Sequence, residues 1–175
     1  MEMYPSCYEE WVPLRDGTKV FLRPVKTTDG PLLSDLFAKL SQASIILRFL
    51  SPLHNLPEKL VHQFSHVDYK KDFGLIALID LGNSSPIIGV GRYAYDSERE
   101  RPELAFVVRD DWQGKGLGSI LVLRVISIGR KNGFSRFGAL MNPENETMMN
   151  IFKRSGYKYK IHSKQQGAHY IEIQA

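Results

Sequence analysis

The residues of this chain best suited to chemistry lie between Glu103 and Gly118. Glu103 begins an otherwise apolar run to Val108, which is rich in the β-branched and aromatic residues of a buried strand. Glycines follow at positions 114, 116 and 118, and a helical pattern begins directly after them. Such a loop directs several unpaired backbone N–H groups at one point, which attracts an anion, most often a phosphate. The stretch therefore predicts a carboxylate, an anion cradle and a helix in close succession.

The helix that must support this cradle is predicted by apolar residues at helical spacing after Gly116. They are Leu117, Ile120, Leu121, Val125 and Ile128. Its end is predicted at Arg130-Lys131-Asn132-Gly133, where cations complement the helix dipole and a glycine leaves the helix. Strand, loop and helix are thus one continuous unit, and the other elements must be arranged around it.

The elements upstream of this unit begin with a predicted hairpin, because an Asp16-Gly17 pair separates two short extended runs. The next predicted elements are a strand at 20–23, helices at 31–40, 41–50 and from Pro57, and apolar strands at 73–79 and 87–95. Gly89 and Gly91 indicate either bulges or close backbone approach in the last of these. The short connections between the strands at 73–79, 87–95 and 103–108 predict antiparallel pairing.

Downstream of the unit, the pattern predicts a strand at 136–141, a helix at 143–155 and two strands at 157–161 and 169–173. The order of strands and helices is that of an α+β fold rather than a regular βαβ alternation. We interpret residues 1–13 as a lead-in and residues 14–175 as one domain, which is the number of domains expected for 175 residues.

The composition argues against several classes of protein. The net charge of +4 is mild and no Lys/Arg-rich tract is present, so nucleic-acid binding has no support; attraction to a phosphate-rich cofactor stays open. The single cysteine, Cys7, excludes an internal disulfide and a cysteine-based metal site. His62 and His66 lie four residues apart, but no glutamate follows His62, so no metal is predicted. Without a signal-peptide pattern or an apolar run of about 20 residues, we predict a cytoplasmic protein that does not bind membranes.

Three phosphate-binding patterns compete for the glycine loop. A Walker loop requires Ser or Thr directly after its Gly-Lys pair, whereas Gly116 follows Lys115 here. A dinucleotide fingerprint requires Gly-x-Gly-x-x-Gly and an acidic residue about 20 positions further on. The loop has Gly-x-Gly-x-Gly and no such acidic residue. Both patterns are poor matches.

The loop Gln113-Gly114-Lys115-Gly116-Leu117-Gly118 instead resembles the acetyl-coenzyme A pyrophosphate loop of the GNAT acyltransferase superfamily, Gln/Arg-x-x-Gly-x-Gly/Ala. A second run, from Asn145 to Tyr157, resembles the superfamily signature Asn-x-x-Ala-x-x-x-Tyr-Glu-Lys-x-Gly-Phe. Two motifs in the right order are far more specific than a six-residue match alone. The runs 14–18, 22–24, 48–52 and 107–114 are similar to the acetyltransferase domain of bacterial Pat-type protein lysine acetyltransferases.

This resemblance implies a GNAT fold with a mixed, mostly antiparallel sheet of six to seven strands and about four flanking helices. The sheet is expected to splay between its fourth and fifth strands, with acetyl-CoA in the split as the cosubstrate. The cofactor-binding residues that the resemblance implies are Val107, Val108, Gln113, Gly114, Lys115, Gly116, Leu117, Gly118, Ser119, Asn145, Phe152 and Arg154. The loop amides would hold the pyrophosphate, and the backbone of Val107 and Val108 would pair with the pantetheine arm.

Several of these positions have a second explanation. Val107 or Val108 also packs in the core, because strand side chains alternate between faces. Asn145 is equally suited to cap a helix, and Arg154 to lie on a solvated helix face. Phe152 stands where many relatives have a tyrosine that protonates the departing thiolate, so no general acid is assigned.

Glu103 matches the catalytic glutamate position of the lysine acetyltransferases and is the predicted general base. A lysine amine has an ordinary pKa of about 10.4, so a base must remove its proton before it attacks a thioester at neutral pH. The alternative is a strand-end charge that faces water.

The predicted function is acetyl transfer from acetyl-CoA to an amine, foremost a protein lysine, by a monomer or homodimer. No motif specifies the acceptor groove, so two alternatives stay open. In the first alternative, the acceptor is a small-molecule amine or an N-terminal amine. In the second, the chain is an inactive module that senses acyl-CoA.

Overall fold

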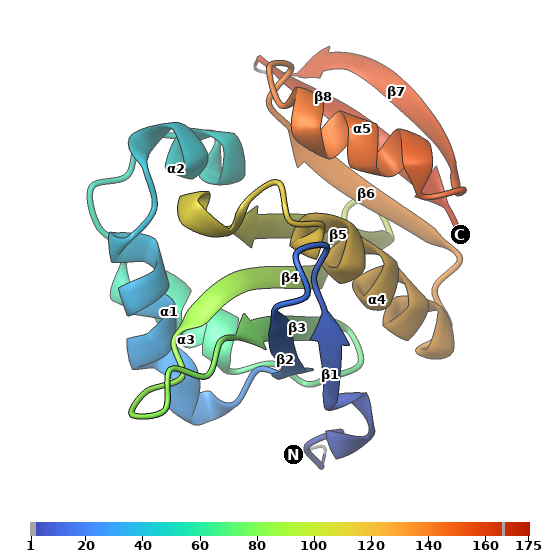
Figure 1. The fold of residues 1–175 in the computed structure, drawn as a ribbon. Coiled ribbons are helices and arrows are strands. Elements are labelled where there is room, and N and C mark those ends of the chain that lie inside the picture. Colours follow the sequence, from blue (N-terminus) through green and yellow to red (C-terminus); the bar gives the residue numbers. More distant parts are fainter. Residues whose placement is uncertain (1–2, 166) are drawn as a thin grey trace.

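The computed structural model describes residues 3–165 and 167–175, and one mixed sheet forms its centre (Figure 1). The strands are β1 (Glu10–Pro13), β2 (Lys19–Pro24), β3 (Asp72–Leu78), β4 (Ile87–Asp96), β5 (Arg101–Val108), β6 (Arg136–Met141), β7 (Lys158–Gln165) and β8 (Ala168–Gln174). Their order across the sheet is β1-β2-β3-β4-β5-β6-β8-β7. Neighbouring strands are antiparallel except β5 and β6, which confirms the predicted mixed, mostly antiparallel α+β sheet.

The described sheet has eight strands rather than six or seven, because part of the expected lead-in belongs to it. Strand β1 pairs with β2 from Glu10↔Leu22 to Pro13↔Lys19, and a short 3-10 helix, η1 (Ser6–Tyr8), precedes it. The predicted Asp16-Gly17 turn joins the two strands, and the positive φ of 84° at Gly17 explains the glycine there. Residues 10–13, which the sequence analysis placed in the lead-in, form this edge strand, and no sequence pattern marks such a short strand.

The helices form layers on both faces of the sheet (Figure 1). They are α1 (Gly30–Ala38), α2 (Gln42–Phe49), α3 (Glu58–Ser65), α4 (Leu117–Lys131) and α5 (Glu146–Arg154). Each lies where the sequence pattern predicts a helix, whereas the family resemblance implied about four. Helix α4 packs on β3, β4 and β5, whereas α1 packs on the opposite face of β4 together with α3. Helix α5 contacts α4 and lies beside the β6–β8–β7 part of the sheet (Figure 1).

Strand β4 shows how the sheet separates these layers. A Cβ atom at Gly89 or Gly91 would lie 3.0 Å from a side-chain carbon of α4, so the glycines let that helix approach the strand. Val90, between them, packs with the apolar residues of α1 on the other face. The close-approach explanation of the two glycines is therefore confirmed.

The turn before α1 is fixed by a buried ion pair. Asp29 is 3% exposed and accepts two hydrogen bonds from Arg23, at 2.7 and 2.8 Å, and one from the backbone N–H of Lys26 at 2.7 Å. Buried carboxylates are tolerated when they are satisfied in this way. The pair therefore holds the start of α1 against β2.

The sheet opens between β5 and β6. These parallel strands are aligned at a single pair, Glu103↔Gly138, whereas β4 and β5 stay in register from Asp96↔Arg101 to Gly89↔Val108. From Leu104 to Val108, the edge of β5 on the side of β6 therefore has no paired strand. This splay lies between the fourth and fifth of the strands predicted from the sequence, as expected. Among the described residues, no helix has both the length and the hydropathy needed to cross a membrane.

Candidate active site

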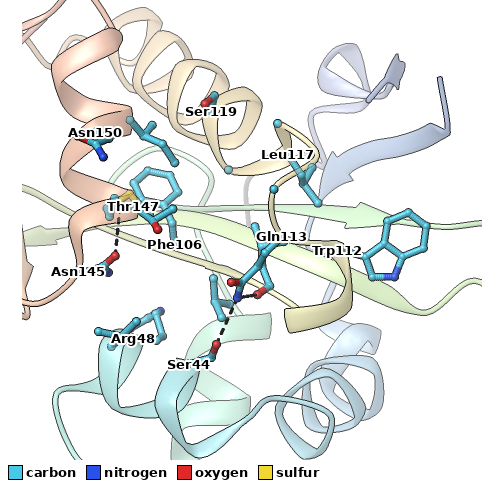
Figure 2. Close-up of a pocket in the computed structure, with 18 of the residues that line it drawn as sticks. Ser44, Arg48, Phe106, Trp112, Gln113, Leu117, Ser119, Asn145, Thr147 and Asn150 are labelled. Carbon is cyan, nitrogen blue, oxygen red and sulfur yellow. Dashed lines mark hydrogen bonds between the residues drawn. The ribbon is translucent and has the colours of Figure 1, made fainter. Parts of the chain in front are cut away.

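A cavity of about 340 Å³ lies between the end of β5, the start of α4, and helices α2 and α5 (Figure 2). Most of the predicted cofactor residues line it. They are Val107, Val108, Gln113, Gly114, Gly116, Leu117, Gly118, Ser119, Asn145 and Arg154. The structure thus brings the two sequence motifs, which lie on different elements, to opposite walls of one cavity.

The glycine loop presents backbone donors to this cavity. Gly114 and Gly116 have φ values of +74° and +91°, which L side chains rarely adopt, and Gly116 is the N-cap of α4. The first N–H groups of a helix have no partner within it, and the first bond of α4 runs from Ile120 N–H to the Gly116 carbonyl at 3.2 Å. The amides of residues 117–119 are therefore free for an anion, which fits a pyrophosphate.

The β1–β2 turn braces the loop from outside the cavity. The Arg15 N–H donates to the Lys115 carbonyl at 3.0 Å, and the Lys115 ammonium pairs with Asp16 at 2.7 Å. Lys115 does not line the cavity, so its side chain supports the loop instead of facing the predicted ligand. Arg15 does line it, and a Cβ atom at Gly116 would lie 3.2 Å from Arg15 Nε. The turn thus adds a cation that the motifs did not predict.

Helix α2 is tied to the same loop by side-chain hydrogen bonds. The Asp110 carboxylate accepts from the Ser41 N–H at 3.0 Å and from the hydroxyls of Ser41 and Ser44 at 2.6 and 2.7 Å. Gln113 donates to the Ser44 hydroxyl at 3.2 Å and to the Val108 carbonyl at 2.9 Å (Figure 2). Although burial raises the pKa of Asp110, these hydrogen bonds outweigh it and lower that pKa below its ordinary value. The ionised carboxylate is therefore what holds α2 in place.

Helix α5 forms the opposite wall, from which Asn145, Thr147 and Asn150 lie toward the cavity (Figure 2). The Asn145 side chain accepts from the Met148 N–H at 3.1 Å and caps the helix, so the capping explanation of Asn145 is confirmed while the residue also lines the cavity. Phe152 does not line it: it is 2% exposed and packs edge-on against Phe106 in the core. The motif position of Phe152 thus fulfils a packing role here.

Glu103 lies where β5 and β6 begin to separate, and its side chain is 33% exposed. Burial raises its pKa above the ordinary glutamate value, while Arg99, at 3.9 Å, and Arg48 act in the opposite direction. Arg99 is engaged more closely by Asp96, at 2.6 Å. Glu103 is not part of the cavity lining, but Arg48 is, and the charge of Arg48 acts on the Glu103 carboxylate.

The lining residues that the sequence analysis missed include Arg15, Ser44 and Arg48. Arg15 and Arg48 fall within short runs that resemble Pat-type domains, and that resemblance was the only available signal. Of the described residues, no three His, Cys, Asp or Glu side chains gather as a metal site requires.

Comparison with known proteins agrees with this geometry. Residues 19–158 match the model of the family described as the acetyltransferase (GNAT) domain. The chain is 29% identical over 150 residues to acetyltransferase PA5475 of Pseudomonas aeruginosa, a match that covers 85% of this chain and 81% of that protein. It is 30% identical over 152 residues to acetyltransferase Pat of Mycolicibacterium smegmatis, a match that covers 83% of this chain but only 43% of that protein.

Solved structures give the same result. The crystal structure of the GNAT domain of S. lividans PAT has a TM-score of 0.89 and 31% identity, covering 99% of this chain and 100% of that domain. The structure of yncA from Salmonella typhimurium, solved with its cofactor acetyl-CoA, shares the fold with a TM-score of 0.66 and 17% identity, over 89% of this chain and 92% of that one. The chain therefore belongs to the GNAT acetyltransferase family, whose members use acetyl-CoA as the acetyl donor.

Proposed function

We propose that this protein acetylates the ε-amine of a protein lysine and that Glu103 is its general base. The observation that carries the proposal is a half-buried carboxylate at the point where β5 and β6 separate, beside the cavity. Similarity to the Pat proteins supports a protein lysine as the acceptor, because this similarity extends to sequence runs outside the cofactor loop.

The donor side of the reaction depends mainly on backbone groups. Acetyl-CoA supplies the activated acetyl group, and the amides of residues 117–119 would hold its pyrophosphate. The backbone of Val107 and Val108 would pair with the pantetheine arm along the side of β5 that β6 leaves free. Arg15 and Arg154 line the cavity, and their charges would attract another phosphate of acetyl-CoA, outside the pyrophosphate.

The acceptor side depends on proton transfer. The lysine must lose a proton to become nucleophilic, and a base is more effective when its pKa is closer to the working pH. Burial of Glu103 moves its pKa in that direction. Glu103 would accept the proton directly or through one water, and the amine would then attack the acetyl carbonyl. A thiol with a pKa of about 8.5 leaves tolerably as the thiolate, which is consistent with a phenylalanine at position 152.

The test measures thiol release from acetyl-CoA with lysine peptides, acyl-CoA synthetases, polyamines and N-terminal amines as acceptors, and mass spectrometry locates the acetyl group. We expect an acetylated lysine, loss of most turnover in Glu103→Gln, and unchanged acetyl-CoA affinity in that variant. Glu98→Gln, an exposed glutamate in the turn before β5, is the matched control. If Glu103→Gln keeps full activity, Glu103 is not the base. Binding of acetyl-CoA without turnover on any amine identifies an acyl-CoA sensor instead.

A further inference from the structure

One buried cation, Arg92, lacks a hydrogen-bond partner among the residues that the structure describes. Arg92 on β4 is 5% exposed, and its terminal nitrogens Nη1 and Nη2 are buried without a hydrogen-bond acceptor in the described part of the chain. Its guanidinium carbon lies 4.4 Å from the centre of the Phe64 ring, and Asp72 contributes only a longer-range favourable charge. A buried charged group without hydrogen bonds is costly, so an unsatisfied guanidinium calls for a ligand.

A second arginine rests on the same ring. The Arg48 guanidinium carbon lies 5.7 Å from the centre of Phe64 and 4.7 Å from that of Phe49. Among the side chains that the structure describes, Arg48 likewise makes no hydrogen bond or ion pair. Burial and, to a lesser degree, the nearby charge of Arg92 lower the pKa of Arg48 to about 10. They therefore form a concentrated positive site.

This cation pair lies near the proposed base, Glu103. Arg92 lies opposite Ala105 in the β4–β5 register, and Glu103 is two residues along β5 on the same face. Arg48 lines the cofactor cavity (Figure 2). The charge of Arg48 also acts on the Glu103 carboxylate. An anion held by the two arginines would thus lie beside the proposed base.

A small cavity gives this anion its size limit. Arg92 borders a space of about 40 Å³ whose other walls are mainly apolar, including Val90, Leu36 and Phe64. Val107 borders both this space and the cofactor cavity, which Arg48 lines, so the two spaces are neighbours. A space of this volume admits a group of only a few heavy atoms. A carboxylate has that size, and its planar pair of oxygens matches a guanidinium.

We propose that Arg48 and Arg92 bind a carboxylate that the acceptor carries close to its reacting amine. The proposal rests on the proposed function and narrows its substrate class to lysines with an acidic neighbour. The carboxylate would satisfy the unpaired guanidinium groups, and it would offset the repulsion between them and the approaching lysine ammonium. The free carboxylate of an amino acid would satisfy the two arginines equally well. Comparing free amino acids with their amides distinguishes such an acceptor from a peptide.

The test compares peptides in which the residue beside the target lysine is Glu, Gln or Lys. We expect wild-type kcat/KM to favour the Glu peptide over the Gln peptide by about tenfold or more. Arg92→Met fills the same space without a charge, and it should remove this preference while leaving the KM for acetyl-CoA unchanged. Arg130→Met, at the exposed end of α4, should keep the preference and is the matched control. Arg48→Met, on the half-buried side of α2, provides the same test if Arg92→Met does not fold.

Binding measurements separate this proposal from the proposed function. The Glu103→Gln protein, loaded with acetyl-CoA, should bind the Glu peptide more tightly than the Gln peptide even without turnover. Faster acetylation of free amino acids than of their amides, lost in Arg92→Met, would support the same site with a small acceptor. Equal rates and equal affinities for all peptides, or a preference that survives both substitutions, would overturn the proposal. A preference for succinyl-CoA over acetyl-CoA that Arg92→Met removes would place the carboxylate on the donor and would also overturn it.

Discussion

The two halves of the active site are built by different means. The cofactor half is one continuous stretch of chain, in which the backbone of β5, the glycine loop and the first turn of α4 provides the donors. The proposed acceptor half consists of side chains from α2, α3, β4 and β5, which come together only through packing. A site of backbone groups depends on local chain geometry, whereas a site of side chains depends on the whole fold. Substitutions in the first half should therefore change cofactor affinity, and those in the second should change the use of the acceptor.

The largest effect is expected in the cofactor half. Gly116→Glu places a carboxylate at the anion site and forces a side chain onto a residue with a φ of +91°. We expect acetyl-CoA to bind about 100-fold more weakly or worse, because several charge-assisted hydrogen bonds are lost. Calorimetry measures the affinity, and circular dichroism reports whether the fold is native.

Gly82→Glu is the matched control for that prediction. Gly82 also has a positive φ, +82°, and nothing lies within 4 Å of a Cβ atom there, but it is in the turn between β3 and β4. It carries the same backbone strain and the same added charge. If both variants lose acetyl-CoA equally, strain or net charge is the cause and the anion cradle is not.

An intermediate effect is expected where the two halves are joined. Asp110→Ala removes the acceptor of three hydrogen bonds that fix the N-terminus of α2. We expect the free energy of unfolding to fall by about 1 to 2 kcal/mol, measured in urea, because three donors, one of them on the buried Ser44, lose a charged partner. The KM for the acceptor should rise, since α2 carries Arg48, while the affinity for acetyl-CoA changes less. Asp111→Ala, whose carboxylate is 61% exposed, should cost well under about 1 kcal/mol.

This stabilisation depends on pH with a defined sign. The pKa of Asp110 is below its ordinary value in the folded protein, so its contribution is complete above the ordinary aspartate pKa. The contribution is lost as the pH falls through the lowered value. Unfolding experiments in acid should therefore show a smaller difference between wild type and Asp110→Ala than at neutral pH. An equal difference at both pH values would contradict a role for the ionised form.

The smallest effect is expected on the pH profile of the acceptor half. Glu103 accepts a proton only when ionised, so kcat/KM should fall as the pH drops below its raised pKa. Arg99→Gln removes a cation 3.9 Å from Glu103 and also frees the charge of Asp96. Both changes raise the pKa of Glu103 further, while Arg48 remains, so the acid limb should move to higher pH. A fixed acid limb would mean that another group controls it.

The sequence was informative about the two halves to different degrees. The strand, glycine loop and helix from Glu103 to Lys131 could be predicted because their contacts are local. Strand β1 could not, since a four-residue edge strand has no periodicity to detect. Arg48 and Arg92 lie 44 positions apart, and only the packing of α2 and α3 on β4 brings both to the Phe64 ring. Lys115 and Phe152 both occupy motif positions. The Lys115 side chain is held by its ion pair with Asp16, and the Phe152 side chain is buried in the core.

The contact between the β1–β2 turn and the glycine loop also affects the synthesis of the chain and the design of truncated variants. Asp16 and Lys115 are 99 positions apart, so during synthesis the turn emerges long before the loop that it supports. The contact that supports the loop can therefore form only after the chain has closed this long separation. A truncated chain that begins after the turn would keep every residue of both signature motifs, yet it would lose the contact that steadies the cradle. Domain boundaries chosen from the motifs alone would remove it.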